Sequence, residues 1–257
     1  MEELGNYLRL SGMLMDEPVY GHEVFGEKFY YATLSVPRLS GAEDLLPITL
    51  SERLMDGMQL EVGSQLSMEG QLRSYNKVIE GAGRLLITGF AQRLLPPDDE
   101  ENPNQVQLTG ALCKLPSYRT TPFGREIADL MLAFNRAYGK SDYIPCITWG
   151  RTARFASHLK VGDRIQLLGR FQSRAYQKQL ADGSVMNKMA YEVSVGRLSV
   201  AHEAAQPGYA YRDMRPEERV TPDGMHILST PQSEARPSIR NPHGRPRLFD
   251  VLLLISY

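Results

Sequence analysis

The feature that most constrains the fold of this chain is an internal repeat. Residues 5–93 and 104–198 share a spaced pattern at a constant offset of 98 or 99 residues. The matched segments are Asn6, Leu10–Gly12, Ile48–Leu50, Val62–Gly63 and Gly70–Ser74 in the first copy, and Asn104, Leu108–Gly110, Ile147–Trp149, Val161–Gly162 and Gly169–Ser173 in the second. This period is well above the roughly 20–50 residues of a solenoid unit, so the chain contains a duplicated domain.

The two copies carry opposite charge. Residues 1–103 hold 8 lysines and arginines against 17 aspartates and glutamates, a net charge of −9. Residues 104–200 hold 14 against 6, a net charge of +8. The net charge of −1 for the whole chain hides this separation. A polyanion is therefore attracted to the second copy and repelled by the first.

Composition sets the expected boundaries. Residues 1–95 and 104–200 are the two predicted domains, each long enough for a packed core. Residues 96–103 form an acidic linker with three prolines, which favours an extended chain. Residues 201–257 contain seven prolines and little apolar material, so we expect a disordered tail.

The same survey disfavours several classes of protein. The two cysteines, Cys113 and Cys146, lack metal-ligand spacing and indicate a reducing compartment. No apolar run approaches the length of a membrane span, and the N-terminus lacks a signal core, so we expect a cytoplasmic protein associated with the nucleoid. The five histidines show no ligand pattern, and no catalytic triad or carboxylate pair stands out. We therefore expect no enzyme, no metal and no cofactor.

The pattern of the second copy favours short strands. Residues 106–110 alternate apolar and polar side chains, residues 143–149 are rich in β-formers, and residues 164–171 read as a third strand. Asp182-Gly183 marks the tip of a hairpin between residues 170–178 and 188–197. Residues 151–159 are the one short helix expected between strands. Such a set indicates a small all-β barrel.

One segment gives two interpretations. Ile127, Leu130, Met131 and Phe134 fall at i, i+3, i+4 and i+7, the spacing of an amphipathic helix. Periodicity alone therefore predicts a helix over residues 126–135. A barrel of the kind indicated by the rest of the copy needs a strand there.

The second copy also mixes aromatic and cationic residues. Proteins bind single-stranded nucleic acid with cations that follow the phosphates and rings that stack on unpaired bases. Arg136, Tyr138 and Lys140 lie together on a predicted loop, and Arg174, Tyr176 and Lys178 lie together on the predicted hairpin. Phe134 and Phe171 are expected in the core. The candidate phosphate ligands are Arg119, Arg125, Arg136, Lys140, Arg151, Arg170, Arg174 and Lys178.

Residues 104–198 resemble a bacterial-type single-stranded DNA-binding protein. The residues that carry the resemblance are Asn104, Val106, Leu108 and Gly110, then Thr121, Pro122 and Gly124, then Leu132, Ala133, Asn135 and Arg136, then 143–150 (YIPCITWG), 162–176 (GDRIQLLGRFQSRAY) and 191–198 (YEVSVGRL). No single motif is specific; the order and spacing over about 95 residues make the match.

The resemblance implies the fold and the stacking residues. The fold would be a five-stranded OB barrel, so the whole chain would be all-β, with two tandem OB-fold domains, a short helix in each and a disordered tail. The base-stacking rings of the family fall on Tyr138, Tyr143, Trp149 and Tyr176. Trp149 has an alternative interpretation as a core residue, because a lone tryptophan in an apolar strand is often buried.

The first copy serves as an internal control. With an offset of 99, Tyr138 corresponds to Leu39, Tyr143 to Asp44, Trp149 to Leu50 and Tyr176 to Lys77, so every stacking position lacks its ring. Gaps can shift these matches by one or two residues, and Tyr75 is close enough to substitute. We expect the first copy to keep the scaffold and to serve assembly or protein recognition.

The sequence therefore predicts a protein that binds and protects single-stranded DNA during replication, recombination or repair. The resemblance also implies four OB domains per assembly, which here means a homodimer. Replication or repair proteins would dock on the acidic first copy, because the tail lacks the acidic tip common in the family. Two alternatives stay open: a primosome-type or mobile-element adaptor with auxiliary binding, and a preference for RNA.

Overall fold

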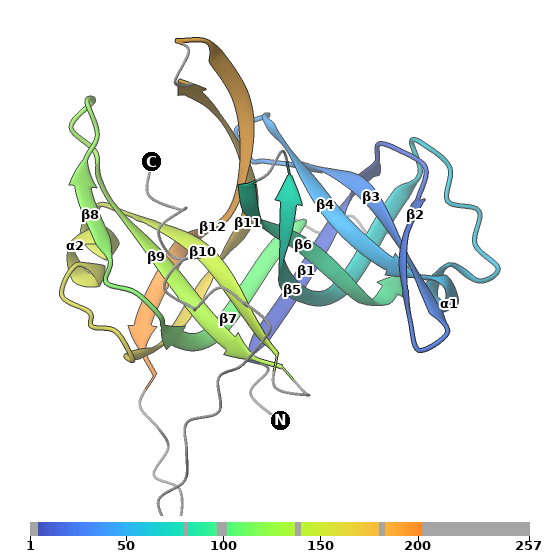
Figure 1. Cartoon of the computed structure of the whole chain (residues 1–257), viewed down its shortest axis with the longest axis horizontal. Helices are drawn as coiled ribbons and strands as arrows, with labels where there is room; N and C mark the ends of the chain where they lie inside the picture. The colour runs from blue at the N-terminus through green and yellow to red at the C-terminus, as the bar shows by residue number, and fades with distance from the viewer. Residues whose placement is uncertain (1–4, 80–81, 97–101, 137–139, 180–182, 202–257) are drawn as a thin grey trace, which may run out of the picture. The chain divides into compact units, whose positions relative to one another are not determined.

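A computed structural model of the chain describes residues 5–79, 82–96, 102–136, 140–179 and 183–201 (Figure 1). Residues 1–202 belong to one compact unit. The tail predicted to be disordered lies outside the described residues. Nearly all of the regular structure in the described part is β-strand.

The two copies have the same succession of elements. The elements of the first are β1 (Asn6–Leu14), β2 (Val19–Val24), β3 (Glu27–Pro37), β4 (Glu43–Ser51), α1 (Glu52–Met55), β5 (Gln65–Ile79) and β6 (Ala82–Leu95). Those of the second are β7 (Asn104–Leu112), β8 (Ser117–Thr120), β9 (Glu126–Asn135), β10 (Ser141–Trp149), α2 (Gly150–Ala156), β11 (Arg164–Gln179) and β12 (Val185–Val200).

Each copy closes into a five-stranded barrel. In the first, the strands pair in the order β1–β3–β4–β6–β5, and β5 returns to β1. In the second, β7, β9, β10, β12 and β11 close in the same way. All of these pairs are antiparallel except β4 with β6 and β10 with β12. This is the OB-fold arrangement, and with one short helix per barrel it confirms the predicted fold class.

The barrels share one sheet. Strands β1 and β7 pair antiparallel, with Asn6 opposite Leu108 and Leu10 opposite Asn104, so twelve strands form a continuous ladder. Because β1 also pairs with β5, and β7 with β11, neither strand has a free edge. The antiparallel pairing relates the two barrels by an approximate twofold axis.

Alternating side chains fill the barrel interiors. Leu8 and Leu10 of β1 are fully buried, and Leu108 of β7 has the same environment in the second barrel. The two long hairpin strands bend at bulges next to Gly70 and Gly169. A Cβ atom at either glycine would fall within 2.0–2.3 Å of a backbone oxygen of the neighbouring strand, which explains the glycines at this bend.

The helix predicted over residues 126–135 is wrong, since this segment is strand β9. Leu130 and Phe134 belong to the barrel core, whereas Ile127 and Met131 are buried outside it, on the opposite face. A strand whose two faces are both covered carries apolar residues at odd and even positions, so its pattern imitates helical spacing. The interpretation that the barrel required is confirmed.

Candidate nucleic-acid interface

The outer face of the second barrel brings the predicted ligand-binding types together. On β11, Arg170 lies opposite Ser194 of β12, and Tyr176 lies opposite Lys188. Phe171 of β11 lies opposite Val193 of β12, and both side chains are fully buried. Because side chains alternate along a strand, Arg170, Arg174 and Tyr176 of β11 therefore point outward. Strand β10 pairs with the other side of β12 and adds its own outward residues to this face.

Trp149 is at the end of β10 and is 40% exposed, which excludes a core role. Its indole nitrogen donates a long hydrogen bond of 3.4 Å to Ser194 Oγ. The ring borders a cleft of about 290 Å³. Arginines form much of the remaining wall, and the lining residues are Arg38, Trp149, Arg170, Gln172, Ser173, Arg174 and Ser194. An indole beside guanidinium groups can take a base on its face and a phosphate on the cations.

The other predicted rings are distributed along the same barrel. Tyr143 is half-buried on β10, on the outward side shared with Trp149. Tyr176 is half-buried on β11, and the guanidinium carbon of Arg174 is 5.9 Å from the centre of its ring. Tyr138 lies outside the described residues. Phe134 and Phe171 are buried, as expected.

The predicted phosphate ligands differ in whether a carboxylate of the protein already pairs with them. Arg125, Arg151 and Lys140 are exposed and have no carboxylate partner within the described ranges. Arg119 pairs with Asp129, and Arg174 pairs with Glu192 at 3.2 Å. Among the rest, Arg170 contacts Gln172 at 3.5 Å, and the side chain of Lys178 lies outside the described part.

Arg136 has a different environment. Its Nε is 2.8 Å from Asp142 Oδ2 without forming a hydrogen bond, so the contact is an ion pair. Asp142 is fully buried and also pairs with Arg73 of the first barrel at 3.2 Å. Burial lowers the pKa of Arg73, and the carboxylate opposes that shift. The positive charge of Arg136 thus already has a counter-charge within the protein, the carboxylate of Asp142.

Contacts between the barrels position β10, and the sequence pattern does not predict them. The backbone N–H of Ser74 donates to Asp142 at 2.5 Å, and the backbone N–H of Tyr143 donates to Ser74 Oγ at 2.7 Å. Arg136 Nη2 adds a hydrogen bond of 3.0 Å to the carbonyl of Ser74. Strand β5 of the first barrel therefore holds the start of β10, where Tyr143 lies.

The reverse contact has the same form. The backbone N–H of Ser173 donates to Asp44 at 2.8 Å, and the backbone N–H of Leu45 donates to Ser173 Oγ at 3.2 Å. Arg38 pairs with Asp44 and donates to the carbonyl of Ser173 at 3.1 Å. A signal was available in the repeat, because Asp44 and Asp142 precede matching apolar strands at the same position of each copy.

This symmetry corrects the offset used for the first copy. Ile48 of β4 pairs with β6 as Cys146 of β10 pairs with β12, which gives an offset of 98 on this strand. The counterpart of Tyr143 is therefore Leu45, and that of Trp149 is Ser51. On β5 the offset of 99 holds, because Ser74 corresponds to Ser173 in the paired contacts. The first barrel still lacks the rings.

Other rings occupy the equivalent face of the first barrel. Phe29 of β3 stacks on His22 at 5.1 Å between ring centres and lies 5.6 Å from Phe90 of β6. Arg73 covers Phe90 at 5.7 Å, and the Tyr31 hydroxyl is 3.1 Å from the imidazole of His22. These rings contact one another, whereas among the described residues of the second barrel no ring contact joins Tyr143, Trp149 and Tyr176.

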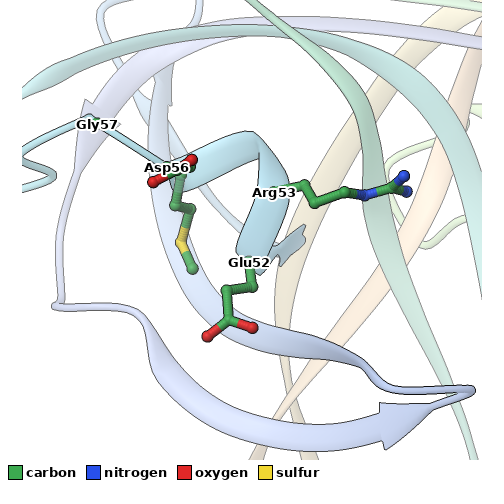
Figure 2. A pocket seen from close by; sticks show the side chains of 5 residues that line it. Glu52, Arg53, Asp56 and Gly57 are labelled. Atoms are coloured by element: carbon green, nitrogen blue, oxygen red, sulfur yellow. The ribbon is translucent and has the colours of Figure 1, made fainter.

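A second hollow of about 490 Å³ lies beside α1 in the first barrel and does not resemble a ligand site. Figure 2 shows that Glu52, Arg53 and Asp56 point in different directions. Arg53 pairs with Glu27 at 3.0 Å, and Glu52 pairs with Lys28 at 3.1 Å. These charges neutralise each other in pairs.

Within the described ranges, no group of three or more His, Cys, Asp or Glu side chains could hold a metal ion. Nor does that part of the chain contain a helix long and apolar enough to span a membrane.

Comparisons with known proteins agree with this geometry. The model of the single-strand binding protein family matches residues 103–201. Single-stranded DNA-binding protein A of Bacillus subtilis is 40% identical over 83 residues, which are 30% of this chain and 48% of the relative. Single-stranded DNA-binding protein B of the same organism is 35% identical over 83 residues, or 30% of this chain and 74% of the relative. The chain spans about half the length of the first curated relatives it matches.

Solved structures match over both barrels. The wild-type single-stranded DNA binding protein from Thermus aquaticus aligns with a TM-score of 0.58 and 24% identity, covering 79% of this chain and 96% of the other. At this identity the likeness concerns the fold alone. The match to most of the Bacillus subtilis B protein, with the family model over the second barrel, shows that this chain belongs to the single-strand binding protein family.

Proposed function

We propose that this chain binds and protects single-stranded DNA during replication, recombination or repair, and that it is a binding protein and not an enzyme. The observation that carries the proposal is the outer face of the second barrel, which presents Trp149, Arg170, Arg174 and Tyr176 together. The names of the Bacillus relatives support it, since they are single-stranded DNA-binding proteins. A protein with this role works in the cytoplasm, on the nucleoid.

Binding would proceed by capture and stacking. The net charge of +8 on residues 104–200 attracts the phosphates, and the cations follow the backbone of the strand. Bases then stack on Tyr138, Tyr143, Trp149 and Tyr176, each contact contributing about 1–3 kcal/mol. Because every base has a stacking face, little sequence preference results.

The first experiment is a competition between single-stranded DNA, single-stranded RNA and duplex DNA. Trp149 is the only tryptophan of the chain, so its fluorescence reports on one proposed stacking site. Oligo(dT) should quench it, duplex DNA should not, and neutralising four phosphates should give a slope of about −3 in log K against log salt. Equal binding of duplex, or no dependence on salt, would contradict the mechanism. A preference for single-stranded RNA would be consistent with the same mechanism of capture and stacking, but it would identify RNA as the ligand.

The second experiment removes the rings. The double variant Trp149→Ala/Tyr176→Ala should lose at least tenfold in affinity for oligo(dT), measured by filter binding. Leu45→Ala is a control in the first barrel, because Leu45 is a 41% exposed side chain on β4, the strand that corresponds to β10. Unchanged affinity of the double variant would refute stacking on this face.

We propose a different role for the first barrel, as a surface for protein contact. Its net charge of −9 over residues 1–103 repels DNA, and its face rings contact one another. The proposed domains are residues 1–95 and 104–200, joined by residues 96–103. Alanine at Tyr30 and Tyr75 should leave affinity for oligo(dT) unchanged; a loss as large as that of Trp149→Ala would overturn this division.

We also propose that the chain forms a homodimer with four OB domains. The support is the family resemblance, in which four such domains act together. Sedimentation equilibrium at concentrations that bind oligo(dT) should give twice the mass of one chain, and a monomer under those conditions would contradict the assembly.

A further inference from the structure

Both barrels expose a phenylalanine at the tip of the same hairpin. Phe123, between β8 and β9, is 93% exposed, and Phe25, between β2 and β3, is fully exposed. Each is followed by a glycine with positive φ, Gly124 at +75° and Gly26 at +81°. The pair Phe-Gly recurs at an offset of 98, the value that holds for neighbouring β4 and β10.

The turn of the second barrel does not require a phenylalanine. The N–H of Gly124 donates to the carbonyl of Thr121 at 2.8 Å, and the N–H of Thr121 donates to the carbonyl of Arg125 at 2.8 Å. This is a turn with Pro122 at its second position and glycine at the bulge, where both residues suit the backbone. Phe123 occupies the third position, which favours small polar residues. The backbone conformation therefore accounts for Pro122 and Gly124 in this turn, but it does not require a phenylalanine at position 123.

The backbone conformation of the turn in the first barrel disfavours a phenylalanine. Val24 pairs with Glu27, which leaves Phe25 and Gly26 as a two-residue loop, and Phe25 has a φ of +52°. A bulky side chain is an outlier in this region, and strained residues cluster at functional sites. The two tips thus keep the same exposed ring in turns of different geometry, so folding does not account for it.

The surroundings of the two rings differ in charge. Residues 117–126 contain Arg119 and Arg125 with one glutamate, Glu126. The corresponding residues 19–28 contain Glu23 and Glu27 with one lysine, Lys28. Arg125 follows Phe123 by two residues, is exposed, and has no carboxylate partner in the described part of the chain.

Phe123 lies at the tip of the hairpin whose strand β9 pairs with the end of β10. Trp149 pairs with Ile127 across β10 and β9. Phe123 is four residues from Ile127, so the Cα atoms of Phe123 and Ile127 are at most about 14 Å apart. The hairpin of β8 and β9 extends away from the barrel (Figure 1). In OB folds generally, the loop that contains this hairpin borders the ligand path.

We infer that Phe123 is a base-stacking residue, which takes an unpaired base of single-stranded DNA beyond Trp149 while Arg125 contacts its phosphate. Phe25 has the same exposure in an acidic setting and takes no base. This inference rests on the proposed function and adds a binding site to it.

The test compares matched alanine variants in the full chain. Phe123→Ala should lower affinity for a long oligo(dT) on the order of tenfold, whereas Phe25→Ala should leave it unchanged. Both rings are exposed, so neither variant removes core packing. Circular dichroism and the unfolding midpoint check the fold of each. An equal loss of affinity in both variants would contradict the assignment of base stacking to Phe123 and not to Phe25, which rests on the charge around each ring.

A second measurement reports contact directly. In a Trp149→Phe background, Phe123→Trp and Phe25→Trp each place a single indole at one tip. Oligo(dT) should quench the first and not the second. If Phe123→Ala binds normally and its indole is not quenched, the inference fails while a loss in Trp149→Ala still supports the proposed function. If Trp149→Ala also binds normally, both fail.

Discussion

Trp149 and Tyr143 show how single outward residues distinguish the second barrel from the first. Both lie on the outward side of β10, where the first barrel has Ser51 and Leu45. The residues that point inward on the two strands are equally buried, for example Ile144 and Leu46. Because inward and outward positions alternate, the outer face can change without disturbing the core. The two barrels therefore share their cores and differ in their outward residues.

Tyr143→Ala should reduce affinity for oligo(dT) by about 5- to 160-fold, because it removes one stacking contact of about 1–3 kcal/mol. Stability should change little, since the backbone N–H that bonds Ser74 is retained. Fluorescence titration measures the affinity, and Leu45→Ala is the control at the matching position. A loss confined to stability would show that Tyr143 supports the fold and does not contact DNA.

Cys146 gives a prediction for pH. Burial in the core raises the pKa of its thiol far above the ordinary value, and burial also raises the pKa of the half-buried Cys113. A folded pKa above the unfolded value stabilises the native state below the unfolded pKa and loses that contribution as pH rises beyond it. The free energy of unfolding should therefore fall above about pH 9, by up to about 1.4 kcal/mol per pH unit.

The variant Cys146→Val removes the titrating group and keeps an apolar side chain. Urea unfolding between pH 7 and 10 should show a shallower decline for this variant than for the parent chain. Alkylation followed by mass spectrometry should find Cys146 protected in the native state at pH 8. Rapid labelling of Cys146 without unfolding would refute its burial.

At the scale of elements, two strands from different barrels hold each other in place. Strand β5 supplies Ser74 to the start of β10, and β11 supplies Ser173 to the start of β4. Each barrel thus completes the polar contacts of a buried aspartate in the other. The acidic barrel therefore positions the start of β10, where the proposed stacking residue Tyr143 lies.

Ser74→Ala should destabilise the chain by about 1–2 kcal/mol, because the N–H of Tyr143 loses its buried acceptor. It should also weaken binding of oligo(dT), since β10 is less well positioned. Urea unfolding gives the stability, and titration at a temperature where the variant is folded gives the affinity. Ser173→Ala is the symmetric control for stability. Normal affinity in folded Ser74→Ala would show that β10 keeps its position without this contact.

Asp142→Ala should be more severe, with a loss of about 3–5 kcal/mol. The substitution leaves Arg73 and Arg136 without their buried counter-charge. The unfolding midpoint in urea measures the loss, and Asp129→Ala is the control because Asp129 forms an exposed pair with Arg119. Similar losses in the two variants would contradict the importance of burial.

At the scale of the molecule, the shared sheet couples the two barrels. Five residue pairs join β1 and β7, and the buried aspartates add contacts across the same boundary. We expect residues 1–202 to unfold in one cooperative transition, with equal calorimetric and van't Hoff enthalpies. The variant Tyr7→Pro changes a residue of this ladder, and it should split the unfolding transition into two or lower its midpoint temperature. Two transitions in the parent chain would contradict the coupling.

Much of the fold follows from the sequence because the repeat could be compared with itself. The strands near residues 106–110, 143–149 and 164–171 and the hairpin around Gly183 are confirmed. The segment 126–135 could not be assigned from pattern, since Ile127 and Met131 are covered on the face opposite the core. Periodicity describes the burial of one element and carries no information about which neighbours cover it.

By itself, the sequence determined the duplication, the opposite charges of the copies and the set of rings that only the second copy has at these positions. Local composition and short-range alternation carry these properties. The tertiary structure alone decided the offset of 98 on β10, the pairing of β1 with β7 and the exchange between Asp142 and Ser74. These depend on contacts between residues about 40 or more positions apart, which are set by how the barrels close and meet.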